Sequence, residues 1–356
     1  MKRLLFFINP NAGHAEIRSS LMDVLQIFCK AGYAPTIHMT SGPRDITRQI
    51  AERGPQYDLL VCAGGDGTLN EAVSGLMALP YDKRPPLGYI PGGTVNDVAT
   101  SGAQVKYLSC GFVLEEGYPM DKLRQIVRTM AQTAAEAGVS IVTGDTKVVE
   151  RGHADGVFIN TAGVGLVPAG VNLSGRNCKP GDKVLVSGTL GDHGICIISQ
   201  REGLAFSTTL TTDAAPLNHL IAAVLEAAPH TRAFRDPTRG GLASTLNEFA
   251  EASGVDIVVA EDDVPVRDEV RGACEMLGYD VFQVANEGKM VAVVPADEAD
   301  AALAAMRASR YGENAAIIGE VCEPACEGGH TVRLKTAFGS TRILDMLVGE
   351  QLPRIC

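Results

Sequence analysis

The chain passes from an apolar strand through a glycine loop into a helix at Asp58-Leu-Leu-Val-Cys-Ala-Gly-Gly-Asp-Gly-Thr68. Short apolar runs that end in glycine are typical of buried strands followed by sharp turns. The same order recurs on both sides of this stretch, with strands predicted at 4–8, 34–38, 58–62 and 87–90 and helices at 15–30, 44–53 and 68–79. This alternation predicts a right-handed parallel α/β sheet over residues 1–92.

The glycine loop itself is a candidate nucleotide site. Glycines let backbone N–H groups approach phosphate oxygens, and the start of the following helix adds positive potential. An aspartate in the loop suits Mg²⁺ or a ribose hydroxyl. The loop 9–13 follows the first predicted strand and would face the same crevice. The candidate residues are Gly64, Gly65, Asp66, Gly67 and Thr68. A plain strand-to-helix turn is the alternative.

Three motifs in this region resemble the catalytic domain of diacylglycerol and related lipid kinases. They are Asn9-Pro-Asn-Ala-Gly13, Gly64-Gly-Asp-Gly-Thr-Leu-Asn-Glu71 and Pro91-Gly-Gly-Thr-Val-Asn-Asp97. The resemblance covers about residues 1–100 and implies that the loops hold ATP. The β-rich domain that carries the lipid site in that family is not found in the rest of this sequence.

Beyond residue 105 the pattern changes to a second, α+β arrangement. A long helix is predicted at 120–138, ended by Gly138, and two paired strands at 141–149 and 157–159. A subdomain boundary is expected near 170–185. A strand at 183–187 follows, and helices and strands alternate again over 216–320.

Polar residues at predicted turns supply candidates for chemistry. Asp145, Lys147 and Glu150 place an acid, a cation and a second acid at the end of a predicted buried strand. There Lys147 would neutralise a transferring phosphate and Asp145 would hold a metal ion. A surface ion pair beside a turn is the alternative. Glu287 is a candidate base or ligand, with turn formation as the alternative. His193 suits acid–base work or a structural role.

Bulk composition restricts the partners and the compartment. The formal net charge is −11 with no basic cluster, which argues against nucleic acid. No apolar stretch is long enough for a membrane span. Nine scattered cysteines predict a reducing cytoplasm rather than a disulfide framework. The pair Cys322 and Cys326 lacks a second ligand pair, so a surface turn is favoured over a metal site.

The final residue, Cys356, is a candidate reactive thiol. A terminal residue is exposed and free to move, so packing is a poor explanation for a cysteine there. Such a thiol would be able to visit one site for modification and another for delivery. A chance terminal cysteine is the alternative.

The sequence from Gly93 to Cys356 resembles the hydrogenase maturation factors of the HypE family, which are carbamoyl dehydratases. The resemblance lies in segments 93–99, 107–117, 142–149, 188–194, 285–289 and Pro353-Arg-Ile-Cys356. It implies the two-domain fold of PurM-type, ATP-using synthetases. It also implies that HypF carbamoylates Cys356 and that ATP then phosphorylates the carbamoyl oxygen. Loss of phosphate leaves a thiocyanate, whose cyanide goes to a HypC–HypD complex.

The same resemblance assigns site residues and a subunit arrangement. Asn96, Asp97 and Asp145 belong to the ATP–Mg²⁺ site, with Asp97 and Asp145 as metal ligands. Cys356, Lys147, Glu150 and Glu287 are the catalytic candidates, for phosphate stabilisation and proton removal around the thiol. A homodimer is implied as well.

One part of the HypE pattern is replaced. Lipid-kinase-like sequence stands where that family has a first segment that helps to bind ATP and metal and adds strands to a dimer barrel. We interpret the chain as a fusion joined near 88–97, with segments 1–92, 93–175 and 176–350 and a tail at 351–356. We therefore expect weakened or lost ATP turnover. A lipid kinase and a catalytically silent scaffold are the alternative functions.

Overall fold

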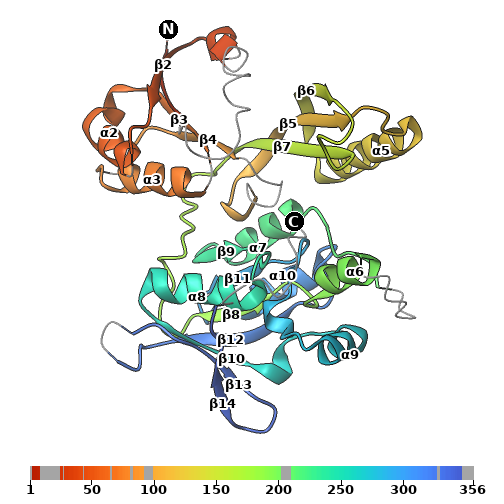
Figure 1. Cartoon of the computed structure of the whole chain (residues 1–356). Helices are drawn as coiled ribbons and strands as arrows, with labels where there is room; N and C mark the ends of the chain where they lie inside the picture. The colour runs from red at the N-terminus through yellow and green to blue at the C-terminus, as the bar shows by residue number, and fades with distance from the viewer. Residues whose placement is uncertain are drawn as a thin grey trace. The chain divides into compact units, whose positions relative to one another are not determined.

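The computed structural model describes residues 2–8, 25–26, 28–42, 44–64, 66–80, 83–91, 99–201, 210–326 and 329–346. The chain divides into two compact units (Figure 1). Unit 1 comprises Met1–Val98 and Val105–Leu166, and unit 2 comprises Ala99–Gln104 and Val167–Cys356. The predicted segment boundaries at 92, 175 and 350 stay a prediction.

The first sheet of unit 1 is built on an apolar strand whose residues Leu4, Leu5, Phe6 and Phe7 are fully buried. Leu5 and Phe7 belong to one core cluster, while Leu4 and Phe6 belong to another, so both faces of the strand are covered. All pairings are parallel, in the order β2-β1-β3-β4. The strands are β1 (Lys2–Ile8), β2 (Tyr33–Met39), β3 (Leu59–Gly64) and β4 (Leu87–Pro91). The predicted parallel α/β sheet is therefore confirmed.

Two helices of this sheet match their predicted positions. They are α2 (Asp45–Arg53) and α3 (Asp66–Met77). Ile46 and Ile50 of α2 are buried with Leu5, Phe7 and Leu60 of the sheet in one cluster. Strand β3 ends at Gly64 and α3 begins at Asp66, so the glycine motif is a strand-to-helix turn. Most of the predicted helix 15–30 lies outside the described residues.

The second sheet of unit 1 has three strands in the order β6-β5-β7. These are β5 (Gln104–Glu115), β6 (Ser140–Val149) and β7 (Val157–Leu166). Helix α5 (Met120–Ala137) connects β5 to β6, which pair in parallel. Gly138 ends the helix in the left-handed region at φ 68°, as predicted.

Two expectations about this sheet were wrong. Strands β6 and β7 are not paired with each other, because β5 lies between them. Helix α5 is a crossover between the parallel strands β5 and β6, so β6 pairs with one edge of β5. The other edge of β5 is then left for β7. Strand β6 is also not buried: Ser140–Val148 are all exposed.

Unit 2 contains a seven-stranded sheet in the order β14-β13-β10-β12-β8-β11-β9. The neighbouring strands β8 and β11 pair antiparallel, and all four residues of β11 are fully buried. The strands are β8 (Lys183–Val186), β9 (Ala233–Arg235), β10 (Asp256–Ala260), β11 (Val291–Val294), β12 (Ala316–Cys322), β13 (Val332–Lys335) and β14 (Thr341–Ile343).

Five helices accompany this sheet in the described part of unit 2 (Figure 1). Leu242, Leu246 and Phe249 of α8 share one core cluster with Val184, Val291 and other sheet residues. Helix α7 packs against α10, and α6 packs against α9. The helices are α6 (Asp192–Arg201), α7 (Asn218–Ala227), α8 (Gly241–Ser253), α9 (Asp268–Leu277) and α10 (Ala299–Ala308).

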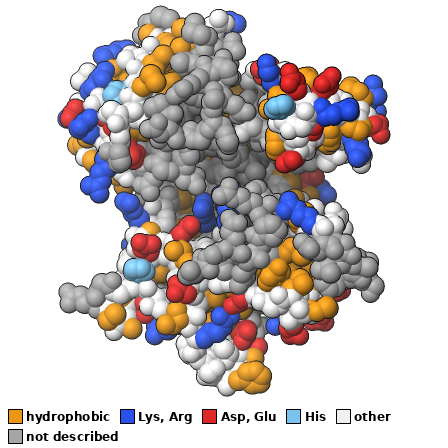
Figure 2. Space-filling model, viewed as in Figure 1, with side chains coloured by type: hydrophobic (Ala, Val, Ile, Leu, Met, Phe, Trp, Pro, Cys, Tyr) orange, Lys and Arg blue, Asp and Glu red, His pale blue; other side chains and the backbone are white. Residues whose placement is uncertain are grey.

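Surface character agrees with the composition. On the face drawn in Figure 2, acidic and basic side chains of the described residues are intermingled. No helix among the described residues is both long enough and apolar enough to cross a membrane.

Candidate active site

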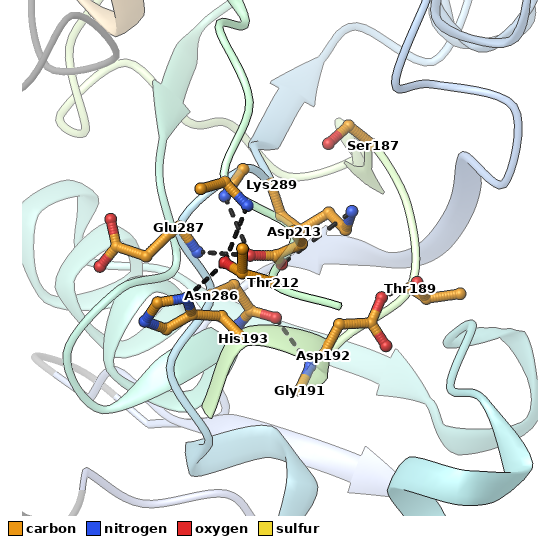
Figure 3. A network of polar contacts seen from close by, with 12 residues as sticks. Ser187, Thr189, Gly191, Asp192, His193, Thr212, Asp213, Asn286, Glu287 and Lys289 are labelled. Carbon is orange, nitrogen blue, oxygen red and sulfur yellow. Dashed lines mark hydrogen bonds and ion pairs between the residues drawn. The ribbon is translucent and has the colours of Figure 1, made fainter. Parts of the chain in front are cut away.

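A polar turn precedes strand β11 in unit 2 and connects several distant segments (Figure 3). We call Asn286, Glu287, Gly288 and Lys289 the 286–289 turn. Asn286 is fully buried, and its Oδ1 accepts a hydrogen bond of 2.7 Å from the Gly191 N–H. Its Nδ2 donates to the carbonyls of Pro237 and Val284, each at 3.0 Å. The turn is therefore fixed to the start of α6 and to the segment before α8.

Asp213 holds the same turn from another side. Its Oδ1 accepts hydrogen bonds from the N–H groups of Glu287 at 3.0 Å and Gly288 at 3.3 Å. A Cβ at position 288 would collide with the Asp213 carbonyl oxygen, so the close approach requires glycine. The Lys289 ammonium lies 3.9 Å from Asp213 Oδ2. The backbone of candidate base Glu287 is thus positioned by a carboxylate 74 residues away in the chain.

The start of α6 faces this network. His193 Nδ1 lies 2.8 Å from the Thr212 hydroxyl, beside Asp213. Asp192 Oδ2 accepts a hydrogen bond of 2.5 Å from the Thr189 hydroxyl and lies 3.3 Å from Arg267 Nε. The Gly191 N–H, directly before α6, is bound to Asn286, so the start of α6 is tied to the 286–289 turn.

Burial dominates the electrostatics of Asp192. Its side chain is 4% exposed, and loss of solvation raises its pKa above the ordinary value. The Thr189 hydrogen bond and the charges of Arg267 and Lys289 oppose this rise, while the nearby Asp213 carboxylate adds to it. A buried carboxyl with a raised pKa beside a second carboxylate is typical of functional sites.

Two of the catalytic and metal candidates of unit 1, Asp145 and Lys147, lie on β6, and Glu150 directly follows it. Asp145, Lys147 and Glu150 are all exposed, and Asp145 Oδ1 accepts a hydrogen bond of 2.8 Å from the Thr146 N–H. The strand end that was predicted to be buried is therefore open to solvent. Glu287 belongs to unit 2, where its N–H is bound to Asp213. Lys147 belongs to unit 1.

Several other candidates fall outside the described residues. These are Cys356, Asn96, Asp97 and Gly65. Gly64 ends β3, and Asp66, Gly67 and Thr68 form the first turn of α3. Among the described residues, no group of three or more His, Cys, Asp or Glu side chains is placed to hold a metal ion. The Mg²⁺ ligands Asp97 and Asp145 stay a prediction.

Asp213, Thr212 and Lys289 are the members of the network that sequence reasoning missed as functional residues. Asp213 and Thr212 lie in the extended segment before α7, where no periodicity or glycine pattern singles them out. Lys289 lies in the polar cluster 285–289, which the sequence indicates. The sequence does not indicate that Lys289 forms an ion pair with Asp213. Contacts over such distances in the chain are set by the fold.

The fold and this network together define the class of protein. Residues 91–167 match the family described as AIR synthase related protein, N-terminal domain, and residues 179–329 match its C-terminal domain. The chain is therefore built on the PurM-like architecture of AIR synthase-related proteins. Residues 3–109 match the diacylglycerol kinase catalytic domain, which agrees with the parallel sheet of unit 1.

Within that class the similarity is much more specific. The carbamoyl dehydratase HypE of Cupriavidus necator is 54% identical over 264 residues, which cover 74% of this chain and 74% of that protein. A crystal structure of hydrogenase maturation protein HypE in complex with ATP is 49% identical with a TM-score of 0.70, covering 74% and 79% of the two chains. A crystal structure of the HypE–HypF complex is 47% identical with a TM-score of 0.69, covering 72% of this chain and 82% of that chain. This chain belongs to the HypE family.

Proposed function

We propose that this chain uses ATP to dehydrate a carbamoyl group carried on the sulfur of Cys356. The product is a thiocyanate that supplies cyanide for maturation of a [NiFe] hydrogenase. The observation that carries the proposal is 54% identity to a carbamoyl dehydratase over 264 residues. The preorganised 286–289 turn in unit 2 supports it, because it fixes the backbone of a carboxylate suited to proton removal.

The proposed chemistry keeps every atom in balance. The carbamoyl oxygen attacks the γ-phosphorus of ATP, ADP leaves, and one N–H proton is lost to give an S-linked carbonimidic phosphate. Loss of the second N–H proton then expels inorganic phosphate with that oxygen. Sulfur stays bound to carbon, and a C≡N triple bond forms. Phosphorylation matters because it turns a poor leaving group into a good one.

Residue roles are assigned on this scheme. Glu287 is the base for the carbamoyl N–H, and Lys147 and Glu150 stabilise and orient the phosphate. Asn96, Asp97 and Asp145 bind ATP, with Mg²⁺ held by Asp97 and Asp145. Magnesium would neutralise charge on the phosphates, and oxygen ligands of this type suit it. Glu287 is supported by its contacts with Asp213, and the other roles rest on family resemblance.

Partners and compartment follow the same proposal. HypF is the carbamoyl donor, as the similarity to the HypE–HypF complex supports. A HypC–HypD complex accepts the cyanide. A second copy of the chain covers the exposed apolar side chains of the β6-β5-β7 sheet, namely Val142, Val148, Phe158, Val164 and Leu166. The described cysteines are free thiols, which suits the reducing cytoplasm.

The replacement of the family's first segment should affect the rate of ATP turnover. The family's own first strands would add cover to β6, and here lipid-kinase-like sequence precedes the PurM-like part. An uncovered sheet positions Asp145 and Lys147 less firmly than a packed one. We expect ATP turnover below that of a HypE protein with its own N-terminal segment.

Mass spectrometry of the intact protein, followed by analysis of its C-terminal peptide, tests the proposal. The full chain is incubated with HypF, carbamoyl phosphate and ATP, and we expect first a carbamoyl adduct and then loss of one water. Replacing ATP by a non-hydrolysable analogue after carbamoylation should stop the reaction at the adduct.

Two variants make this experiment specific. Cys356→Ser should remove both mass changes, while Glu287→Gln should keep the adduct and slow water loss by about 10²- to 10⁴-fold, the usual contribution of a general base. An adduct on another cysteine, or water loss that does not need ATP, would contradict the proposal. Phosphorylation of added diacylglycerol would favour a lipid kinase instead.

A further inference from the structure

The hairpin of strands β13 and β14 carries the most exposed large apolar side chain among the described residues. This is Phe338, which is 98% exposed, and Ile343 on β14 is 65% exposed. The hairpin lies at one edge of the seven-stranded sheet, and the turn between its strands extends beyond the helices of unit 2 (Figure 1). A single exposed apolar residue is common on protein surfaces, so the setting of Phe338 decides what it means.

The turn that presents Phe338 is fixed by hydrogen bonds. The Thr336 N–H donates to the Ser340 carbonyl at 2.8 Å, and the hydroxyl oxygens of these two residues lie 2.7 Å apart. From outside the hairpin, Glu261 Oε2 accepts a hydrogen bond of 3.2 Å from the Ala337 N–H. A partner that binds the ring therefore has little backbone to order, which lowers the entropic cost of association.

Acidic residues lie beside this turn. Glu261, Asp262 and Asp263 form the short helix η3 directly after β10, and Glu261 contacts the turn itself. One cation is close to them, because Lys335 of β13 pairs in register with Ala260 of β10. Aromatic side chains are enriched in the cores of protein interfaces, and complementary charges around them speed association. The hairpin tip therefore suits a partner with an apolar pocket rimmed by Lys or Arg.

The position of the hairpin in the chain indicates which partner this is. The Leu344 N–H donates to the Val332 carbonyl at the base of the hairpin, and the described residues end two positions later, at Met346. The ten residues from there to Cys356 span at most about 36 Å. The eight residues between Phe338 and Met346 span at most about 29 Å. A protein that modifies Cys356 must therefore bring its active site close to this hairpin.

We propose that the hairpin tip around Phe338 is a docking site for HypF, the carbamoyl donor of the proposed function, on which this inference rests. Phe338 fills an apolar pocket on HypF, and basic side chains around that pocket face Asp262 and Asp263. Docking at this place brings the active site of the donor within reach of Cys356.

Binding measured without any chemistry tests the docking site. The full chain is titrated with HypF in the absence of carbamoyl phosphate and ATP, and Phe338→Ala should weaken binding about 30-fold, the effect of truncating an interface anchor. Phe338→Leu keeps an apolar side chain and should weaken it less. Val127→Ala is the control, because it truncates a 46% exposed apolar side chain in unit 1 and should leave binding unaltered. Equal binding of the wild type and Phe338→Ala, or no binding of the wild type, would overturn the proposal.

The acidic rim and the choice of occupant have their own tests. Asp262→Asn combined with Asp263→Asn should slow association with HypF about threefold at low salt and leave dissociation unaltered. An unaltered association rate would overturn the basic rim on HypF. Phe338→Ala is also compared with the wild type in sedimentation of the chain alone and in binding to HypC–HypD. A loss in either of these with unaltered HypF binding would show a different occupant and overturn the proposal.

Carbamoylation kinetics separate this inference from the proposed function. In Phe338→Ala the apparent KM of HypF for the chain should rise about 30-fold with kcat unchanged, because a docking contact is the same in the ground state and the transition state. A fall in kcat at unchanged KM would contradict docking. If HypF binds through Phe338 but leaves Cys356 unmodified, the proposed function fails while the docking site stands.

Discussion

The seven-stranded sheet of unit 2 and the β6-β5-β7 sheet of unit 1 differ sharply in burial. All four residues of β11 are fully buried, whereas Ser140–Val148 of β6 are all exposed. Strand β11 is apolar throughout, whereas β6 mixes apolar and polar residues. The apolar Ile141, Val142 and Val148 of β6 are nevertheless exposed. Helices such as α8 pack on the sheet of unit 2. Burial is set by the layer that covers a strand, and the residues that the structure describes leave Ser140–Val148 of β6 exposed.

The same difference is found between the candidate site residues of unit 2 and those of unit 1, each taken by itself. Glu287 is part of a network in which Asn286 and Asp213 make hydrogen bonds to three separate segments. Lys147 on β6 and Glu150, the residue after β6, are exposed. Glu287 in unit 2 is therefore held by a hydrogen-bonded network, whereas the candidates of unit 1 on and beside β6 are exposed.

The largest expected effect compares the two sheets by truncating one apolar side chain in each. Leu185→Ala in β8 removes a fully buried side chain and should lower the free energy of unfolding by about 3 kcal/mol. Val148→Ala in β6 removes a side chain that is 59% exposed and should change it by less than about 0.5 kcal/mol. Urea unfolding followed by circular dichroism measures both. Similar losses would show that β6 is packed in solution.

A second substitution acts on the network that preorganises the 286–289 turn. Asn286→Ala removes the side-chain partners of the Gly191 N–H and of the Val284 carbonyl in a buried site. The Pro237 carbonyl keeps its bond from the backbone N–H of residue 286. We expect a loss of about 2 kcal/mol in unfolding free energy. Asn177→Ala is the control, because its hydrogen bond to Asn172 is exposed and should contribute little. Equal effects of the two would contradict a preorganised turn.

A smaller effect distinguishes two buried aspartates, one in each unit. Hydrogen bonds from Ser41 and His38 lower the pKa of Asp45, while burial raises the pKa of Asp192. The Asp45 contribution is therefore present above its unfolded pKa of about 3.9 and is lost as pH falls below it. Ionised Asp192 opposes folding at neutral pH, and this penalty disappears as pH falls through its raised folded pKa toward its unfolded value.

Substitutions should consequently act with opposite signs at pH 7. Asp45→Asn should destabilise α2 by about 1 kcal/mol, because the charge-assisted hydrogen bonds are weakened. Asp192→Asn should leave α6 equally stable or more stable, because a buried charge is removed. Hydrogen exchange resolved by peptide, at pH 7 and near pH 4, reports each helix separately. A shift of the same sign in both would contradict these pKa directions.

Local signals in the sequence predicted much of the fold. The apolar run at Leu4–Phe7 indicated β1, and Gly138 indicated the end of α5. The pairing and burial of β6 were not predicted, because strand order depends on which edge the α5 crossover reaches and burial depends on a second layer. Asp213 was missed since its partners Glu287 and Gly288 are 74 and 75 residues away in the chain. The 286–289 turn was indicated by its polar residues alone.

Hydrogen exchange of β6 and β11, measured over a series of protein concentrations, tests the difference between the two sheets most directly. In dilute solution, where sedimentation shows a monomer, we expect β6 amides to exchange quickly and β11 amides slowly. Raising the concentration should slow β6 as a second copy covers it, and β11 should stay unchanged. Exchange of β6 as slow as that of β11 in the dilute monomer would contradict the account.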